Sequence, residues 1–337
     1  MNVVYLFRRL KGMNYGRALQ SAKHVANITG KSTASVMMDI VDCYKKHGTG
    51  YVDYETFEMY NMNDAQRAEI LSVSKNNMMV RKLNQADKRF YLDDKAVFNK
   101  HYDKFIKRDW LLIDGDNFDA FDKFCEDKES IFMKPLDQSC GAGIEKLRME
   151  DYPTREDRHA LYQRLLADKC VLAEEVVVQC EEMSKLCTTS VNTVRLVTIL
   201  KDGVVHVAAG AIRMGKEGAF VDNFNHGGLA VLVDVNKGES VTDGYDKWRK
   251  TYEYTPILGT KLKGFKIPQW EACVELVKEA ALVVPEVRYI AWDVCITENY
   301  GPLLIEGNAY PGQDVTQYPK LNLGTYKEFK KILGDEI

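Results

Sequence analysis

The sequence predicts an α+β protein in which helices and antiparallel strands occupy separate stretches of the chain. Apolar and polar residues recur at helical spacing through residues 1–90. From Ser190 onward, short apolar runs separated by turn residues predict β-hairpins. Residues 91–180 mix the two patterns. We therefore expect a helical N-terminal region at 1–90, a first α+β lobe at 91–180 and a second at 181–337.

The composition is that of an ordinary globular protein. The chain has 337 residues, 45% of them hydrophobic and 28% charged, which is enough for two or three packed units. A net charge of -3 gives no reason to expect nucleic-acid binding. No apolar run approaches the length of a membrane span, and the eight cysteines form no Cys-x-x-Cys pair. The start puts apolar residues before the arginines, the reverse of a secretory signal, so we expect a cytoplasmic protein with reduced thiols.

Basic residues are concentrated at the N-terminus. Six precede the first acidic residue, Asp39, namely Arg8, Arg9, Lys11, Arg17, Lys23 and Lys31. Such a segment can touch an anionic membrane, an acidic substrate or a partner, or it can simply be a solvated helical face. We expect at most weak, salt-sensitive peripheral contact with anionic lipid.

Three helices are expected in the N-terminal region, over Ala18–Ile28, Ser35–Tyr44 and Ala65–Val80. Asn63-Asp64 supplies an N-cap for the third of them. A further helix is expected to begin at Lys95, where Asp93 or Asp94 can cap it. Taken alone, Lys95 is an ordinary surface lysine.

A short apolar strand, Ile131–Lys134, ends at Pro135 and is followed by a glycine-rich turn. Gly141 and Gly143 allow backbone N–H groups to approach an anion, and Ser139 adds a hydroxyl donor. The spacing is not that of a Walker A loop. A lid over polyphosphate and an ordinary turn both fit this pattern.

A helix over Thr154–Ala167 and a strand over Cys170–Val178 are expected next. Two acids, Glu174 and Glu175, interrupt this apolar strand, which is costly unless they meet a ligand or a partner. Two more acids follow within reach of the same place if the chain curls, Glu181 and Glu182.

A hairpin is predicted by two apolar strands on either side of Lys201-Asp202-Gly203. Its strands, Val194–Leu200 and Val204–Arg213, carry Arg195 and Arg213. Arginines in apolar strands are either paired or directed at an anion. A salt bridge to Glu174 or Glu175 is the structural alternative.

Strands at 220–223 and 230–233 and a helix over Trp270–Val284 complete this part of the chain. Polar residues that flank the expected strands are candidates for a substrate pocket; these are Asp222, Asn223, His226 and Gln313.

The most informative feature is an apolar hairpin with three oxygen-bearing side chains near the C-terminus. Asp293 lies on its first strand, and Glu306 and Asn308 lie on the returning strand after a turn at residues 298–302. Residues two apart on a strand share a face, so the three side chains can converge. Two carboxylates and an amide oxygen suit Mg²⁺. The alternative is a strand pair with solvated polar residues.

In this order, the elements resemble those of the ATP-grasp superfamily, and most closely its sugar-transfer-associated group. The resemblance covers residues 90–320. It assigns the two nucleotide-binding lysines to Lys95 and Lys134, and the glycine-rich lid to Gln138–Ile144. It assigns the hinge that meets adenine to Glu174-Glu175-Val176-Val177, and the ribose-binding acid to Glu181 or Glu182. It assigns the metal site to Asp293, Glu306 and Asn308. The helical N-terminal region departs from the open α/β domain common in this superfamily.

The resemblance implies an ATP-grasp fold that holds ATP and two Mg²⁺ ions between two lobes. It implies a carboxylate–amine or carboxylate–hydroxyl ligase that works through an acyl-phosphate, on a sugar-linked or amino-acid substrate in polysaccharide or cell-surface glycan biosynthesis. Lys134 and Arg213 would neutralise phosphate charge, and Arg195 would bind the substrate carboxylate or the phosphate. A small-molecule kinase and a non-catalytic nucleotide-binding scaffold are the alternatives.

Overall fold

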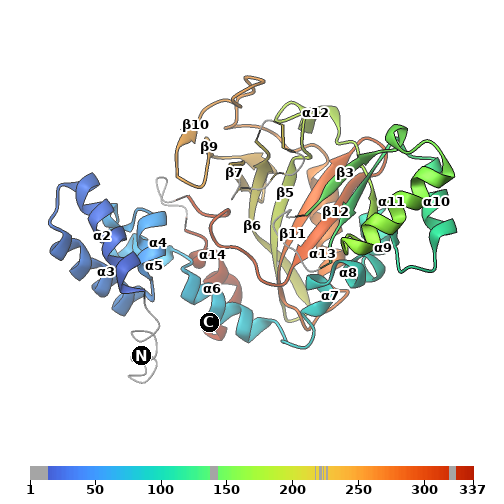
Figure 1. Ribbon diagram of the computed structural model, residues 1–337. Coiled ribbons are helices and arrows are strands. Elements are labelled where there is room, and N and C mark those ends of the chain that lie inside the picture. Colours follow the sequence, from blue (N-terminus) through green and yellow to red (C-terminus); the bar gives the residue numbers. More distant parts are fainter. Residues whose placement is uncertain are drawn as a thin grey trace. The chain divides into compact units, whose positions relative to one another are not determined.

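A computed structural model describes residues 14–136, 143–216, 218–219, 222, 224, 227–318 and 324–337. The chain forms two compact units, which are described separately (Figure 1). The first comprises Met1–Met79 and Thr316–Ile337, and the second comprises Val80–Val315. The division thus joins the N-terminal helices to the C-terminal end of the chain. Among the described residues, no helix has the length and apolar character needed to cross a lipid bilayer.

The first unit is helical. Its elements are α2 (Tyr15–Thr29), α3 (Thr33–His47), α4 (Tyr51–Thr56), η1 (Met59–Asn61), α5 (Asp64–Glu69), the start of α6 (Val73–Leu83), α14 (Tyr326–Leu333) and η5 (Gly334–Glu336). Asn14 and Ser32 cap α2 and α3, and Gly30 and Gly48 end them in the left-handed conformation. These two helices contain the predicted ranges 18–28 and 35–44.

The single helix predicted over Ala65–Val80 is wrong. Asn63 and Gln66 form a capping box for α5, but that helix ends at Glu69 because Ile70 is extended and buried. The buried backbone of Leu71 pairs instead with the side chain of Gln317, with Leu71 N to Oε1 at 2.7 Å and Nε2 to Leu71 O at 3.0 Å. A partner 246 residues away therefore stabilises the break.

The second unit begins with short helices and a four-stranded antiparallel sheet. The helices are α7 (Phe90–Asp93), α8 (Lys95–His101) and α9 (Asp103–Ile106), and Asp94 caps α8 through Val97 N. The strands are β1 (Trp110–Leu112), β2 (Ser130–Lys134), β3 (Glu145–Arg148) and β4 (Leu172–Glu175), in the order β1-β4-β2-β3.

The helices α10 (Phe118–Glu126) and α11 (Arg155–Ala167) pack on this small sheet (Figure 1), and η2 (Met149–Asp151) follows β3. Phe121, Leu161 and Tyr162 of the two helices share a core with Ile131 and Met133 of β2. The helix predicted over 154–167 is present, and Thr154 forms its capping box with Asp157. The strand expected over 170–178 is shorter, because pairing ends at Glu175.

A larger, eight-stranded antiparallel sheet follows. Its strands are β5 (Thr193–Lys201), β6 (Val204–Met214), β7 (Leu229–Asp234), β8 (Glu239–Ser240), β9 (Gly244–Tyr245), β10 (Thr251–Tyr252), β11 (Tyr289–Thr297) and β12 (Gly301–Asn308). Their order is β10-β9-β7-β6-β5-β11-β12, with β8 paired to β7. The predicted hairpins at 194–213 and 291–308 are both present. Of the strand expected at 220–223, only Asp222 lies in the described part of the chain.

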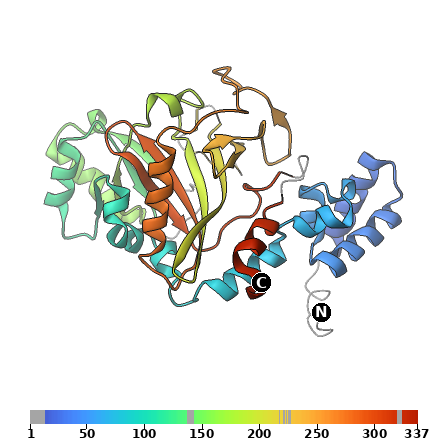
Figure 2. The ribbon, with the colours of Figure 1, turned by 180° about the vertical axis from the view of Figure 1, so that it is seen from behind.

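Helix α13 (Trp270–Ala281), together with apolar residues of α7–α9, covers one face of the large sheet. Figure 2 shows α13, in orange, lying across the strands. Its buried residues Trp270, Cys273 and Val277 share a core with Leu196 and Trp292 of the sheet. The opposite face therefore carries the side chains that alternate with this core.

Candidate active site

Charged side chains gather in the middle of the large sheet, on the face away from α13. On β11, Trp292 and Val294 belong to the core with α13, so Asp293 between them points to the other face. The same alternation places Arg195 on β5 and Arg213 on β6 on that face. Asp293 lies directly opposite Arg195 in the strand register.

A β-bulge brings Glu306 to this cluster. Asp293 pairs with Glu306, but its neighbour Val294 pairs with Leu304, so Ile305 is the extra residue of β12. The extra residue changes the alternation of the strand, which puts Glu306 opposite Asp293. Asn308 is two residues further along the strand and donates from Nδ2 to Glu306 Oε1 at 3.2 Å. The three predicted metal ligands therefore lie together.

Both arginines bind Asp293. Arg195 donates from Nε to Oδ1 at 2.8 Å and from Nη2 to Oδ2 at 2.7 Å, and Arg213 donates from Nη1 to Oδ2 at 2.7 Å. Arg213 also donates from Nη2 to Asp222 Oδ1 at 2.9 Å, and Asp222 accepts from the hydroxyl of Thr193. The predicted alternative, pairing of either arginine with Glu174 or Glu175, is wrong, because their carboxylate partners are Asp293 and Asp222.

The charges of the cluster follow from this pairing. Burial alone would raise the pKa of Asp293, but the two guanidinium groups hold that pKa far below its usual range. Glu306 has the opposite shift, because desolvation and the nearby charge of Asp293 raise its pKa. Asp293 is thus firmly ionised. A cation bound beside Glu306 would stabilise the ionised form of that carboxylate.

A second cluster surrounds Glu174 on the small sheet. The buried carboxylate accepts from Lys134 Nζ at 2.5 Å, from Arg108 Nε at 3.1 Å and Nη2 at 2.9 Å, and from Asn99 Nδ2 at 2.9 Å. Burial would raise the pKa of Glu174, but Arg108 and Lys134 lower it to about 2. Glu174 therefore holds the Lys134 ammonium at the end of β2.

Lys95 lies close to the same strand end. Its Nζ donates to Pro135 O at 3.1 Å and to Leu136 O at 3.3 Å. The two predicted nucleotide lysines are thus brought to one place, directly before the glycine-rich segment. Gly143 has φ of 68°, a conformation that favours glycine, whereas Ser139 and Gly141 lie outside the described residues.

The two clusters are joined by Arg108. Besides Glu174, Arg108 donates to Leu304 O at 2.6 Å and to Ile305 O at 3.3 Å. Ile305 is the bulge residue next to Glu306. One buried guanidinium therefore connects the lysine cluster of the small sheet to the bulge that positions the acid cluster of the large sheet.

The residues predicted to bind adenine and ribose, between 175 and 182, have contacts outside the two clusters. Glu175 accepts from Tyr300 Oη at 3.1 Å and from Asp109 N at 3.0 Å, and Val177 packs against Cys295 and Leu303. Val176 is half-buried, whereas Glu181 and Glu182 are exposed in α12 (Glu181–Ser184). Within the described residues, neither of these last two acids bonds to either cluster.

The sequence analysis did not identify Arg108, Asn99, Gln179 or Asn192. Gln179 Oε1 accepts from Asn192 N at 2.8 Å, and Asn192 Nδ2 donates to Met183 O at 2.9 Å, so this buried pair fixes the loop that leads into β5. The sequence contains an indirect indication of Arg108 alone, since Glu174 in an apolar strand requires a cationic partner somewhere in the chain. Nothing in the local sequence indicates which cation it is.

A model of the family described as sugar-transfer associated ATP-grasp matches residues 74–322. The match spans most of the chain. The chain belongs to the sugar-transfer associated ATP-grasp family. Its architecture, an α+β fold with a small antiparallel sheet beside a larger one, is accordingly an ATP-grasp fold, as the sequence indicates.

Three of the solved structures to which this chain is similar are the following. D-alanyl-alanine synthetase A from Vibrio cholerae is 15% identical with a TM-score of 0.43, over 72% of this chain and 63% of that one. D-Alanine-D-Alanine ligase from Helicobacter pylori is 12% identical with a TM-score of 0.41, over 72% and 61%. N5-carboxyaminoimidazole synthase from Aspergillus clavatus is 10% identical with a TM-score of 0.43, over 73% and 52%.

These matches span less than two thirds of the other chains, and they are too distant to indicate an activity or a substrate. No curated protein matches this member of the ATP-grasp family.

The oxygen-bearing side chains fit the divalent cation that the ATP-grasp family implies. Asp293 and Glu306 supply carboxylates, and Asn308 keeps its amide oxygen available because it bonds to Glu306 through Nδ2. Within the described residues, no group of three or more His, Cys, Asp and Glu side chains is placed to hold a metal. An all-oxygen set of two carboxylates and an amide is of the kind that suits Mg²⁺.

Two candidate substrate residues are described, and two are not. Asp222 is buried and bonded to Arg213, so it belongs to the acid cluster. Gln313 is half-buried in the segment that follows β12. Asn223 and His226 lie outside the described residues.

Proposed function

We propose that this protein is an ATP-dependent, Mg²⁺-requiring carboxylate–amine or carboxylate–hydroxyl ligase that acts through an acyl-phosphate. Its substrate would be sugar-linked or an amino acid, in the cytoplasmic assembly of a polysaccharide or cell-surface glycan. The observation that carries the proposal is the juxtaposition of Asp293, Glu306 and Asn308 with two arginines. Membership of the sugar-transfer associated family supports the sugar-linked substrate.

The nucleotide would be bound by the residues around β2 and β4. Lys95 and Lys134 place two ammonium groups at the end of β2. Phosphate oxygens would there accept hydrogen bonds that Lys95 now donates to Pro135 O and Lys134 to Glu174. Ser139, Gly141 and Gly143 would cover the phosphates. Residues 174–177 would form the adenine hinge, and Glu181 or Glu182 would bind the ribose.

The bound Mg²⁺ would neutralise charge on the phosphate oxygens, with Asp293, Glu306 and Asn308 as its protein ligands. Arg213 and Lys134 would bind the transferring phosphoryl group, and Arg195 would orient the substrate carboxylate or the phosphate. This arrangement supports catalysis by alignment and electrostatic stabilisation rather than by a protein nucleophile.

The reaction would proceed in two transfers. A carboxylate oxygen of the substrate attacks the γ-phosphorus, and the bond to the β–γ bridging oxygen breaks as ADP leaves. An amine nitrogen or a hydroxyl oxygen then attacks the acyl carbon, inorganic phosphate leaves, and the nucleophile loses its proton. Water has to be excluded between the steps, because the acyl-phosphate hydrolyses readily.

Two other functions use the same scaffold. A small-molecule kinase would leave the γ-phosphate on a hydroxyl group, and a scaffold would bind nucleotide without turnover. The buried, ionised Asp293 held by two arginines argues against a scaffold, because binding alone does not need a buried charge of this cost.

A phosphate-release screen tests the proposal. The full chain with ATP and Mg²⁺ is assayed against carboxylates paired with amines and hydroxyl compounds, and we expect ADP and phosphate only when both substrates are present. Glu306→Gln should abolish this turnover, whereas Glu298→Gln, at the exposed turn of the same hairpin, should not. A stable phosphorylated product without free phosphate would identify a kinase, and undiminished turnover by Glu306→Gln would refute the metal assignment.

A further inference from the structure

We propose that Trp248 is an aromatic platform that stacks on a sugar ring in the acceptor part of the active site. The inference rests on the proposed function, because it identifies a saccharide as the acceptor class. It depends on three features of the described residues: the exposure of the indole, the construction of its turn, and the position of that turn in the sheet.

The first feature is exposure. Trp292 and Trp270 are buried in the core, with 0% and 7% of their surface exposed, and Trp110 is half-buried. Trp248 is 70% exposed. An indole left in water gives up the large stabilisation that its burial would provide. Two tryptophans are thus buried and a third is half-buried, whereas the Trp248 ring adds little to the stability of the fold.

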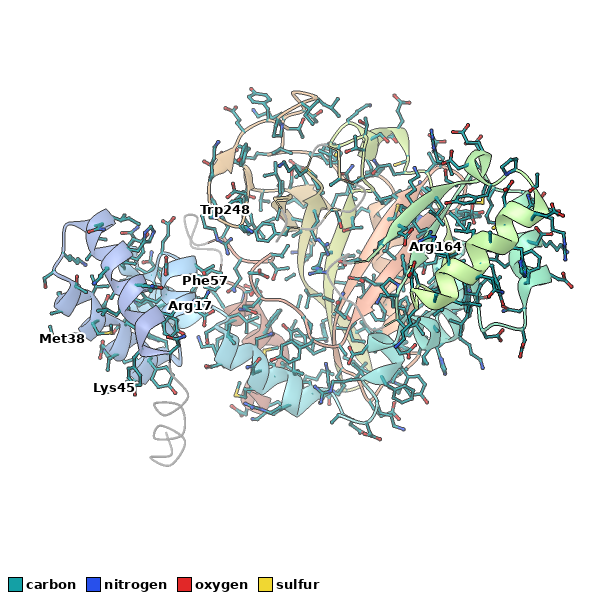
Figure 3. All side chains as sticks on the ribbon, viewed as in Figure 1. Arg17, Met38, Lys45, Phe57, Arg164 and Trp248 are labelled. Carbon is teal, nitrogen blue, oxygen red and sulfur yellow. The ribbon has the colours of Figure 1, made fainter. Side chains whose placement is uncertain are left out.

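The second feature is a turn built to present the ring. Asp246 Oδ1 accepts from Trp248 N at 2.9 Å and from Lys250 N at 3.0 Å, and Tyr252 Oη donates to Asp246 Oδ2 at 3.2 Å. Arg249 has φ of 64°, which reverses the chain directly after the tryptophan. The backbone of Trp248, labelled on its loop in Figure 3, is therefore held by its neighbours while the indole stays exposed.

The third feature is position. The turn joins β9 to β10, at the edge of the large sheet opposite β12, where the lysine cluster is attached. The acid cluster spans β12, β11, β5 and β6, so it begins at the edge where the lysine cluster is attached and extends toward β7. A nucleotide bound at the lysines with its γ-phosphate at the acid cluster would therefore have the β9–β10 edge on its far side, where the acceptor has to lie.

Contacts tie the turn to segments that carry site residues. Tyr245 Oη donates to Val315 O at 2.5 Å, and Arg249 Nη2 donates to Asp314 O at 3.2 Å, both in the segment that follows Asn308. The ring of Tyr245 also contacts Phe224, two residues after Asp222, with centroids 5.9 Å apart. The Trp248 turn is thus anchored to the segment that follows Asn308, and Tyr245 at its base contacts Phe224 near Asp222.

The chemistry of the turn favours a saccharide. A sugar ring has an apolar C–H face that packs on a flat aromatic ring, and hydroxyl groups around it that bond to polar neighbours. Lys247 Nζ lies over the Trp248 ring, 4.5 Å from its centroid, so one face of the indole carries a charged donor. This pairing suits a saccharide that carries a carboxylate, such as a uronic acid.

Tryptophan fluorescence tests this directly, because Trp248 is by far the most exposed indole. The full chain with Mg²⁺ and ADP is titrated with glucuronic acid, N-acetylglucosamine and N-acetylchitotriose while acrylamide quenching is measured. We expect a saccharide to shield the signal in wild type and in Trp110→Phe but to leave Trp248→Phe silent. By calorimetry, Trp248→Phe should still bind that saccharide, and Trp248→Ala should bind it roughly tenfold more weakly.

Phe90→Ala, which removes another exposed ring, is the matched control and should bind saccharide normally. Shielding that appears with rising protein concentration alone would show self-association and overturn the inference. So would equal saccharide affinity in Trp248→Ala, or no response to any of the three saccharides. Acceptor-dependent phosphate release that survives in Trp248→Ala with unchanged KM would refute the platform while leaving the ligase intact. Absence of nucleotide binding in wild type would instead refute the proposed function.

Discussion

Glu174 shows how a single buried carboxylate organises this protein. It accepts hydrogen bonds from Lys134, Arg108 and Asn99, which come from three separate elements or loops. The sequence indicated that an acid in this apolar strand needs a partner, and it placed Lys134 nearby in the proposed nucleotide site. It did not indicate Arg108 or Asn99, because side-chain partners 66 and 75 residues away leave no periodic trace.

We predict that Glu174→Gln destabilises the protein by about 3–5 kcal/mol, because it leaves the buried guanidinium of Arg108 without its counter-charge. The free energy of unfolding from urea titration measures this. Glu181→Gln, at an exposed position of α12, should change it by less than about 0.5 kcal/mol. Equal effects of the two substitutions would contradict this role of Glu174.

The same residue predicts a pH dependence. The folded pKa of Glu174 is lowered from 4.5 to about 2, so its stabilisation is fully present above pH 4.5 and is lost as the pH falls toward 2. The stability difference between wild type and Glu174→Gln should therefore shrink over this acid range. A difference that stays constant from pH 6 to pH 2 would exclude ionised Glu174 as its source.

We predict that catalysis requires the planar guanidinium group of Arg213. It contacts Asp293 and Asp222 through different nitrogens, which a lysine ammonium cannot reproduce. Arg213→Lys should reduce kcat on the order of 10²-fold with little change in nucleotide affinity. Steady-state kinetics and calorimetry measure the two quantities, with Arg148→Lys on the exposed part of β3 as control. Near-normal kcat would remove Arg213 from the phosphoryl site.

At the scale of elements, local turn chemistry made the hairpins predictable. Lys201-Asp202-Gly203 and the turn at 298–302 lie between strands whose register the structure confirms. The break between α5 and α6 was not predictable, because Gln317 provides the backbone partners of Leu71 from the other end of the chain. The bulge at Ile305 was also not predicted, since an extra residue in an apolar run leaves the pattern apolar.

We predict that this bulge is required for the site. Deleting Ile305 should restore regular alternation and turn the Glu306 side chain away from Asp293, so that metal-dependent turnover is lost. Ile305→Val should keep the turnover and cost about 0.5–1.5 kcal/mol. Circular dichroism distinguishes loss of the site from loss of the fold. A folded deletion variant with normal turnover would show that the bulge has no role.

At the scale of the molecule, the chain divides into a discontinuous helical unit and the ATP-grasp sheets. The helices α2 and α3 were predictable from their apolar spacing, and the N-cap at Asn63 was predicted although its helix ends earlier than expected. Their grouping with residues 316–337 was not, because that depends on contacts between opposite ends of the chain, such as Leu71 with Gln317.

We predict that Gln317→Ala weakens the first unit selectively. It would leave the buried N–H and C=O of Leu71 unsatisfied, at about 1–3 kcal/mol for each group. Hydrogen exchange should speed up in 64–79 and 326–333 but stay unchanged in 193–201 and 289–308. Gln66→Ala, at the exposed start of α5, is the control and should alter only its own helix. Uniform acceleration would show that the units do not open independently.

The central claim is that Asp293, Glu306 and Asn308 hold the metal that bridges the phosphates of ATP. A crystal structure of the full chain with Mg²⁺ and a non-hydrolysable ATP analogue tests it most directly. We predict metal–oxygen distances of about 2.0–2.1 Å to these side chains, with the triphosphate between them and Lys134. A nucleotide bound elsewhere, or a metal that none of the three side chains contacts, would contradict the account.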